Sequence, residues 1–234
     1  FKTEAQIFDT RWSWLFVPTM DNYRSVVQDG HIDRYLMNSI KVSIAATLIT
    51  LALGTMCAYA MARFRFLGRE PLGYATLILR TLPPAVLAVP VFVLWSAWGI
   101  ADTLSGVVLV YVALNLPFTI WLLYGFVDQL PIELEEAAAI DGAGEWSQFW
   151  RITLPLIRRT TSFVIVALLI GGFQVFISVF LITGGGPLHR TEVLLSYMYD
   201  QSFNKLEFGY GAALSYILAA IVVLIDRKST RLNS

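Results

Sequence analysis

Five long stretches without a charged side chain most constrain what this chain can fold into. They cover residues 42–62, 81–101, 103–127, 160–188 and 208–225. An α-helix crosses the hydrocarbon core of a bilayer with about 20 predominantly apolar residues. The sequence therefore predicts an all-α fold, a polytopic bundle of transmembrane helices with about five spans present.

The composition agrees with a membrane protein and excludes several other classes. Only 15% of the residues are charged and the mean hydropathy is +0.63, whereas soluble domains carry about 25% charged residues. The net charge of zero gives no reason to expect nucleic acid as a partner. Cys57 lies inside an apolar stretch, and His31 and His189 stand far apart in the sequence. We therefore predict no disulfide within the chain and no metal site.

Arginines in the links between the stretches predict how the helices are oriented. They occur between the first and second stretches and again between the third and fourth, at Arg63, Arg65, Arg69, Arg151, Arg158 and Arg159. Short cytoplasmic loops are enriched in such residues. Segments 63–76 and 128–159 are therefore expected in the cytoplasm, and segments 1–38, 99–104 and 184–207 outside. Three prolines, Pro83, Pro84 and Pro90, predict a kinked or broken second helix.

The two ends of the chain guide the expected domain organisation. The chain begins at Phe1 rather than methionine, and we interpret it as lacking an N-terminal helix. Residues 1–38 are expected to form an extracytoplasmic segment that precedes a transmembrane domain over 39–226. Residues 227–234 look like translated vector sequence, and we interpret them as a non-native tail.

The link 128–159 has the pattern of a helical hairpin. Pro131 suits a helix start, and acidic residues follow in the first turns, where the helix dipole favours them: Glu133, Glu135 and Glu136. One apolar face is expected from Leu134, Ala137 and Ala138, and a second from Trp146, Phe149 and Trp150. Gly142 is expected at the turn between the two helices, and Pro155 at the end of the second. An interfacial hairpin that only caps the bundle has the same pattern.

The spacing within this link resembles the EAA motif of ABC-importer permeases. Glu136-Ala137-Ala138 is followed at the family's spacing by Gly142 and by Ile152-x-Leu154-Pro155. The resemblance implies a type I ABC importer permease fold. It also implies an ATPase-coupling role for Glu136, Ala137, Ala138, Asp141, Gly142, Ala143, Ile152, Leu154 and Pro155. Other segments look like carbohydrate-importer permeases of the maltose type, among them Asn38-Ser39, Ala58-Tyr59-Ala60 and Leu82-Pro83-Pro84.

The resemblance further implies a function and a set of partners. The chain would be the permease of a binding-protein-dependent importer in a bacterial inner membrane, carrying a sugar, polyol or glycerol phosphate by alternating access. Its partners would be a second permease subunit, two cytoplasmic ABC ATPases, an extracytoplasmic solute-binding protein and membrane lipid. ATP and Mg would be bound by the ATPases, because this chain has no Walker A motif and no HExxH or GxSxG motif. We therefore expect no enzymatic activity and no cofactor in this chain.

Three questions stay open at this point. Polar residues within the stretches are candidates for the substrate pathway, although each could instead hydrogen-bond a neighbouring helix: Asn115, Thr119, Gln174 and Ser178. An ATP-independent secondary transporter or channel is the alternative function, and it predicts ionisable residues within spans, which the five stretches lack. Importers of this family contain a pair of permease subunits of two types. Up to Pro155 the chain resembles one type and beyond it the other, so the sequence does not determine which of the two permeases this chain is.

Overall fold

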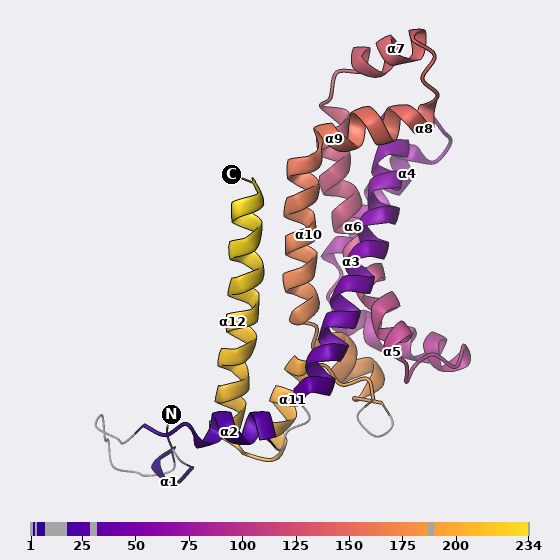
Figure 1. The fold of residues 1–234 in the computed structure, drawn as a ribbon. Helices are drawn as coiled ribbons and strands as arrows, with labels where there is room; N and C mark the ends of the chain where they lie inside the picture. The colour runs from indigo at the N-terminus through magenta and orange to yellow at the C-terminus, as the bar shows by residue number, and fades with distance from the viewer. Residues whose placement is uncertain (1, 3, 8–17, 29–31, 187–189, 234) are drawn as a thin grey trace.

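The described part of the chain is helical throughout. The computed structural model describes residues 2, 4–7, 18–28, 32–186 and 190–233, and every regular element in these ranges is an α-helix or a π-helical turn. Long helices lie side by side, with short helices across both ends of the bundle (Figure 1). The predicted all-α membrane bundle is confirmed.

Among the residues that the structure describes, three helices are long and apolar enough to cross a membrane without a break. They are α3 (Ile32–Arg63), α6 (Leu104–Asp128) and the apolar part of α12 (Phe208–Asn233). Helix α12 continues beyond residue 225, where the predicted last span ends, into the charged residues that follow. At the end where α12 begins, short elements adjoin these helices (Figure 1), among them α1 (Glu4–Ile7), α2 (Asp21–Gln28), α11 (Leu194–Tyr199) and a π-helical turn (Asp200–Asn204).

The second predicted span is a pair of helices bent by 105°. Helix α4 (Arg69–Thr81) packs along α6, and α5 (Pro84–Ala97) crosses the other end of α6, where Trp95 Nε1 donates to Gly106 O. The break falls at Leu82 and Pro83, which both have extended backbone, because the proline ring disfavours helical geometry in the residue before it. The predicted break is confirmed. The predicted start at residue 81 is wrong, because charged residues of the supposed link already belong to α4.

The fourth predicted span, 160–188, is also too long. Helix α10 (Arg158–Phe173) ends after 16 residues, and the N–H of Gln174 donates to the carbonyls of Ile170 and Gly171. A π-helical turn (Val179–Thr183) follows the break. The absence of charged residues could not predict where α10 ends. Glycine and glutamine carry no charge, so they lengthen the uncharged stretch even where the helix stops.

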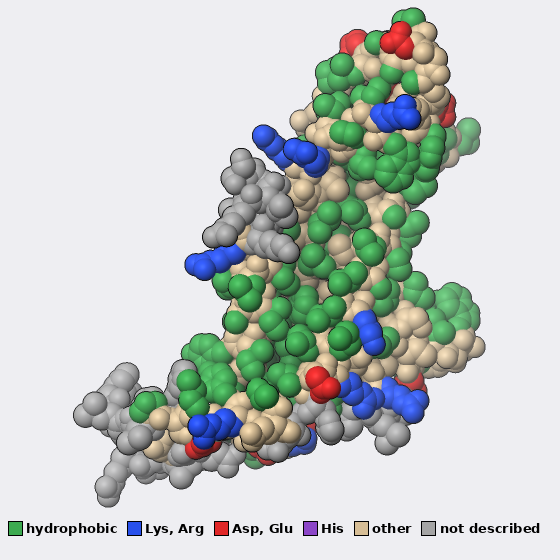
Figure 2. Space-filling view, viewed as in Figure 1, with side chains coloured by type: hydrophobic (Ala, Val, Ile, Leu, Met, Phe, Trp, Pro, Cys, Tyr) green, Lys and Arg blue, Asp and Glu red, His purple; other side chains and the backbone are tan. Residues whose placement is uncertain are grey.

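Small residues let α3 pack closely against two neighbours. An added Cβ at Gly54 of α3 would lie 2.6 Å from the Thr119 side chain of α6. An added Cβ at Gly172 of α10 would lie 2.6 Å from Ser43 Oγ of α3. Figure 2 shows hydrophobic side chains over most of the middle of this face, with most charged residues toward its two ends. This distribution is the one expected of a bundle that crosses a bilayer.

Candidate functional site

A short helix, α7 (Glu133–Ile140), projects beyond the bundle at the end where α6 finishes (Figure 1). It begins two residues after Pro131 and ends at Asp141, and Gly142 follows with a φ of +87°. The N–H of Gly142 donates to Ala139 O, and the N–H of Ala143 donates to Ala138 O. These two bonds form a Schellman motif, which requires the left-handed conformation that glycine adopts without strain.

Most of the α7 surface is exposed. Leu134, Glu136 and Ala137 are exposed, Ala138 is half-buried, and the side chain of Ile140 is 87% exposed. Asp141 is exposed at the turn. Apolar side chains on a small projecting helix, with little of this chain packed on them, leave a surface that another subunit could cover.

The second arm of the hairpin is helical but irregular. It consists of α8 (Glu145–Gln148), a π-helical turn (Phe149–Thr153) and α9 (Leu154–Leu156), and it meets α10 at 76°. The wide turn lies just before Pro155, whose ring cannot donate a helical hydrogen bond. The predicted end at Pro155 is therefore slightly early, because the helix bends at Ile157. Ile152 and Leu154 are half-buried, and Pro155 is exposed.

The three aromatic residues of this segment form one cluster. The ring centroids are 5.8 Å apart for Trp146 and Phe149, 5.8 Å for Trp146 and Trp150, and 5.4 Å for Phe149 and Trp150. Phe149 is 4% exposed and packs against Tyr59 of α3, with ring centroids 5.0 Å apart, whereas Trp146 is 63% exposed and Trp150 is also exposed. The predicted aromatic face is therefore present, with Phe149 against the bundle and the two tryptophans at the surface.

A buried ion pair fixes the hairpin to the bundle. Arg63 Nε, at the last residue of α3, lies 2.7 Å from Glu135 Oε2 of α7, and each side chain is 8% exposed. Arg63 Nη2 also donates to Leu130 O, and Thr153 Oγ1 donates to the other Glu135 oxygen. This anchor cluster of Arg63, Glu135 and Thr153 joins the end of α3 to both arms of the hairpin. Sequence reasoning missed it, because Glu135 was interpreted only as a favourable charge at a helix start.

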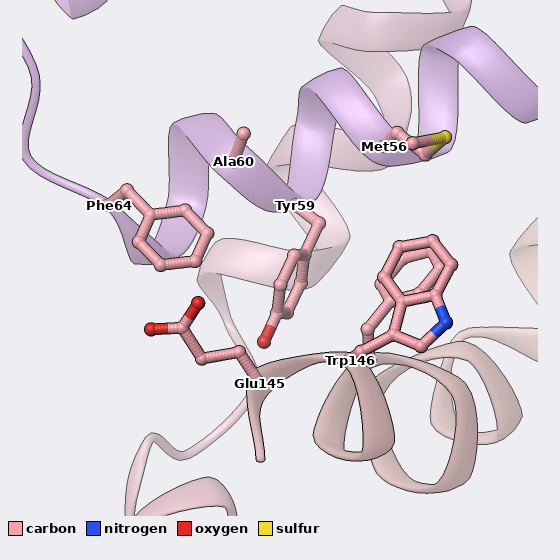
Figure 3. A pocket seen from close by; sticks show the side chains of 7 residues that line it. Met56, Tyr59, Ala60, Phe64, Glu145 and Trp146 are labelled. Carbon is pink, nitrogen blue, oxygen red and sulfur yellow. The ribbon is translucent and has the colours of Figure 1, made fainter.

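A mostly apolar pocket of about 270 Å³ lies between the end of α3 and α8 (Figure 3). Met56, Tyr59 and Phe64 come from α3 and the residue after it, and Trp146 closes the other side. Figure 3 shows the Glu145 carboxylate near Phe64 and Tyr59. The hairpin thus rests on α3 over a space that its side chains do not fill.

The predicted pathway residues occupy different environments. Thr119 is fully buried against Gly54, and its hydroxyl donates to Asn115 O. Asn115 is half-buried and its amide donates to Tyr111 O, as expected for a polar group inside a helix pair. Ser178 is buried and Gln174 is exposed at the end of α10. The four residues therefore do not form one cluster of equivalent, accessible groups.

The described residues do not supply a metal centre. Among them, no group of three or more His, Cys, Asp or Glu side chains is placed to hold a metal ion. What the structure does define is a membrane helical bundle with an anchored, exposed helical hairpin at one end. This arrangement leaves an exposed apolar surface at one end of a membrane bundle.

Comparison with known proteins agrees with this class. Residues 38–232 match the family described as binding-protein-dependent transport system inner membrane component. Similar relatives are the diacetylchitobiose uptake permease NgcG of Streptomyces coelicolor (34% identical over 96% of this chain), the trehalose transport permease SugB of Mycobacterium tuberculosis (37% over 59%) and the trehalose/maltose transport permease MalG of Thermococcus litoralis (33% over 88%). The chain spans 74%, 50% and 75% of the lengths of these relatives, respectively.

Solved structures share the fold at low sequence identity. A bacterial ABC transporter involved in the import of the acidic polysaccharide alginate matches 93% of this chain and 85% of its own chain, with a TM-score of 0.76 and 18% identity. The MetNI methionine ABC transporter matches 92% of this chain and 98% of its own, with a TM-score of 0.68 and 15% identity. The chain belongs to the family of binding-protein-dependent transport system inner membrane components. It is a multi-pass permease of an ABC importer in a bacterial inner membrane.

Proposed function

We propose that this permease carries a saccharide and is driven by ABC ATPases that act on its α7–α9 hairpin. The observation that carries the proposal is the exposed apolar surface of α7, held to α3 by the buried pair of Arg63 and Glu135. A rigid attachment is needed if motion at the hairpin is to reach the membrane helices. The EAA residues Glu136, Ala137 and Gly142 lie on this projecting element, where a partner can reach them.

The substrate class and the partners rest on the relatives. NgcG, SugB and MalG are described by their uptake of diacetylchitobiose, trehalose and maltose, all of which are disaccharides. We infer a working complex with a second permease as a heterodimer, two ATPases that bind ATP and Mg, and an extracytoplasmic binding protein. Opening to alternate sides would then be a switch between two packings of the bundle. The ATP-independent alternative is not favoured, because the relatives and the structural neighbours are components of ABC importers.

A reconstitution experiment tests this proposal. The full-length permease is purified with its second permease and its ATPases, placed in proteoliposomes, and supplied with the binding protein and diacetylchitobiose, trehalose or maltose. We expect at least one sugar to stimulate ATP hydrolysis and to accumulate inside. Uptake without ATP, or hydrolysis that none of the sugars stimulates, would contradict the proposal.

A further inference from the structure

One charged residue lies within the second span rather than at its edge. Arg80 is in the last turn of α4 and its side chain is exposed. Its guanidinium carbon lies 4.9 Å from the centroid of the Phe118 ring on α6, which is the geometry of a cation–π contact. The arginine therefore rests on α6, and the position of Phe118 gives its depth in the bundle.

Arg80 lies near the middle of the membrane. Helix α6 runs from Leu104 to Asp128, and Phe118 is roughly ten residues, or about 15 Å, from its Asp128 end. The other end is about 21 Å away. The hydrocarbon core is about 30 Å thick, so a residue at this level is far from both aqueous surfaces.

Lipid cannot cover this part of the molecule. A charged side chain facing hydrocarbon is costly, and such residues normally face the protein interior or a water-filled cavity. The backbone immediately after Arg80 is also non-helical, since Leu82 and Pro83 are extended and exposed. Non-helical backbone at this depth is tolerated only inside protein or beside water. In the assembled importer, this face must therefore be directed inward.

The guanidinium is free to bind a ligand. Within the ranges that the structure describes, Arg80 forms no ion pair. The Phe118 ring contacts the guanidinium through its face and accepts none of its N–H hydrogen bonds, whereas a carboxylate would accept them. Asn115 lies three residues before Phe118, on the same side of α6, and is half-buried. A cation near the C-terminal end of α4 interacts favourably with the helix dipole. That interaction does not say what covers the guanidinium in the assembled importer.

We propose that Arg80, with Asn115 one turn from its Phe118 contact on α6, forms a saccharide-binding site at mid-membrane depth in the transport pathway. Its ligand is an acceptor-rich saccharide whose hydroxyl, amide carbonyl or carboxylate oxygens accept hydrogen bonds from the guanidinium. This inference rests on the proposed function, because a saccharide reaches this level only if the chain carries one. The proposal adds Arg80 to the pathway candidates. The sequence did not predict this residue, because the candidates came from the uncharged stretches.

Thiol labelling tests whether water and sugar reach this position. Cys57 is the single cysteine of the chain, so a Cys57→Ala background allows Arg80→Cys to be labelled alone on this subunit within the complete complex. A membrane-impermeant hydrophilic maleimide is the probe, and labelling is read by the mass of the subunit. Ile78→Cys is the matched control, because Ile78 is exposed two residues away, on another side of α4.

We expect the Arg80→Cys variant to react at least about tenfold faster than the Ile78→Cys variant. We also expect one of diacetylchitobiose, trehalose or maltose, delivered by the binding protein, to slow labelling of Leu77→Cys, an exposed position one turn from Arg80 that leaves the guanidinium in place. Equal rates at positions 80 and 78, or no protection of Leu77→Cys by any of the three sugars, would overturn the proposal. A wild-type complex whose ATPase responds to sugar while Leu77→Cys is unprotected refutes this site alone. A wild-type complex that responds to no sugar refutes the proposed function.

Transport by charge variants gives an independent readout. Arg80→Gln should reduce sugar uptake about tenfold or more, as expected for the loss of hydrogen bonds to a charged group, whereas Arg80→Lys should retain more of it. Subunit assembly should stay near wild type in Arg80→Gln. If Arg80→Gln instead releases the second permease during purification, Arg80 pairs with a carboxylate of that subunit and the ligand site is wrong.

Discussion

At the scale of single residues, two positions decide whether the hairpin keeps its shape and its attachment. Gly142 has a backbone conformation that other residues adopt only with strain, and Arg63 is a buried cation with a buried carboxylate beside it. The sequence pattern indicates the glycine, because a turn needs it. The ion pair joins residues 72 positions apart and emerges only from the fold.

Replacing Gly142 by valine should uncouple ATP hydrolysis from uptake. A residue with a Cβ in the left-handed region costs about 1–2 kcal/mol, so the Schellman turn should be lost while the bundle stays folded. Uptake per ATP hydrolysed in proteoliposomes measures the effect. Gly144→Val is the control, since Gly144 has a φ of −69° and nothing within 4 Å of an added Cβ. Wild-type coupling in Gly142→Val would refute this role of the turn.

Removing Arg63 should loosen the hairpin from α3. Arg63→Ala leaves the Glu135 carboxylate buried without its cation, and breaking a buried pair in this way costs about 3–5 kcal/mol. We expect a lower thermal unfolding midpoint and faster proteolysis between residues 128 and 159 in the purified complex. Arg65→Ala is the control at a nearby exposed arginine. The double variant R63A/E135A should be less damaging than R63A alone, and equal damage would argue against the pair.

At the scale of helices, close approach and helix breaks both depend on particular small residues. The apolar stretches predict that helices exist, and the prolines predict a break in the second span. The ends of α4 and α10 could not be predicted, because an uncharged stretch continues through Gln174 and charged residues begin α4 at Arg69. Tertiary packing along α6 makes α4 part of the bundle despite its charges.

The contact between α3 and α6 offers a test at this scale. Gly54→Ala should destabilise the permease, because the new Cβ would lie 2.6 Å from Thr119 Cγ2. Thr119→Ser removes that methyl group and should restore much of the loss. Thermal unfolding of the purified complex measures both effects, with Gly125→Ala as a control at a helical glycine with open space around it. Altered sugar selectivity in Thr119→Ser would instead support Thr119 as a pathway residue.

At the scale of the whole molecule, the exposed end of the hairpin predicts where a partner subunit is held. Ile140→Asp places a charge on the most exposed large apolar side chain of α7, so it should weaken binding of the ATPases. Co-purification of ATPase with the tagged permease measures this loss, which we expect to be about tenfold or more. Leu67→Asp is the control, because Leu67 is even more exposed than Ile140 but lies outside the hairpin. Normal co-purification of the Ile140→Asp complex would place the ATPase contact elsewhere.

The sequence by itself determined that this protein is a helical membrane bundle with a hairpin in one link. Hydropathy, turn residues and motif spacing act locally, so they can be read without the fold. The tertiary structure decided which carboxylate anchors the hairpin, which polar residues are packed between helices, and that Arg80 packs on Phe118 near the middle of α6. Each of these depends on contacts between segments far apart in the chain, and no local pattern contains that information.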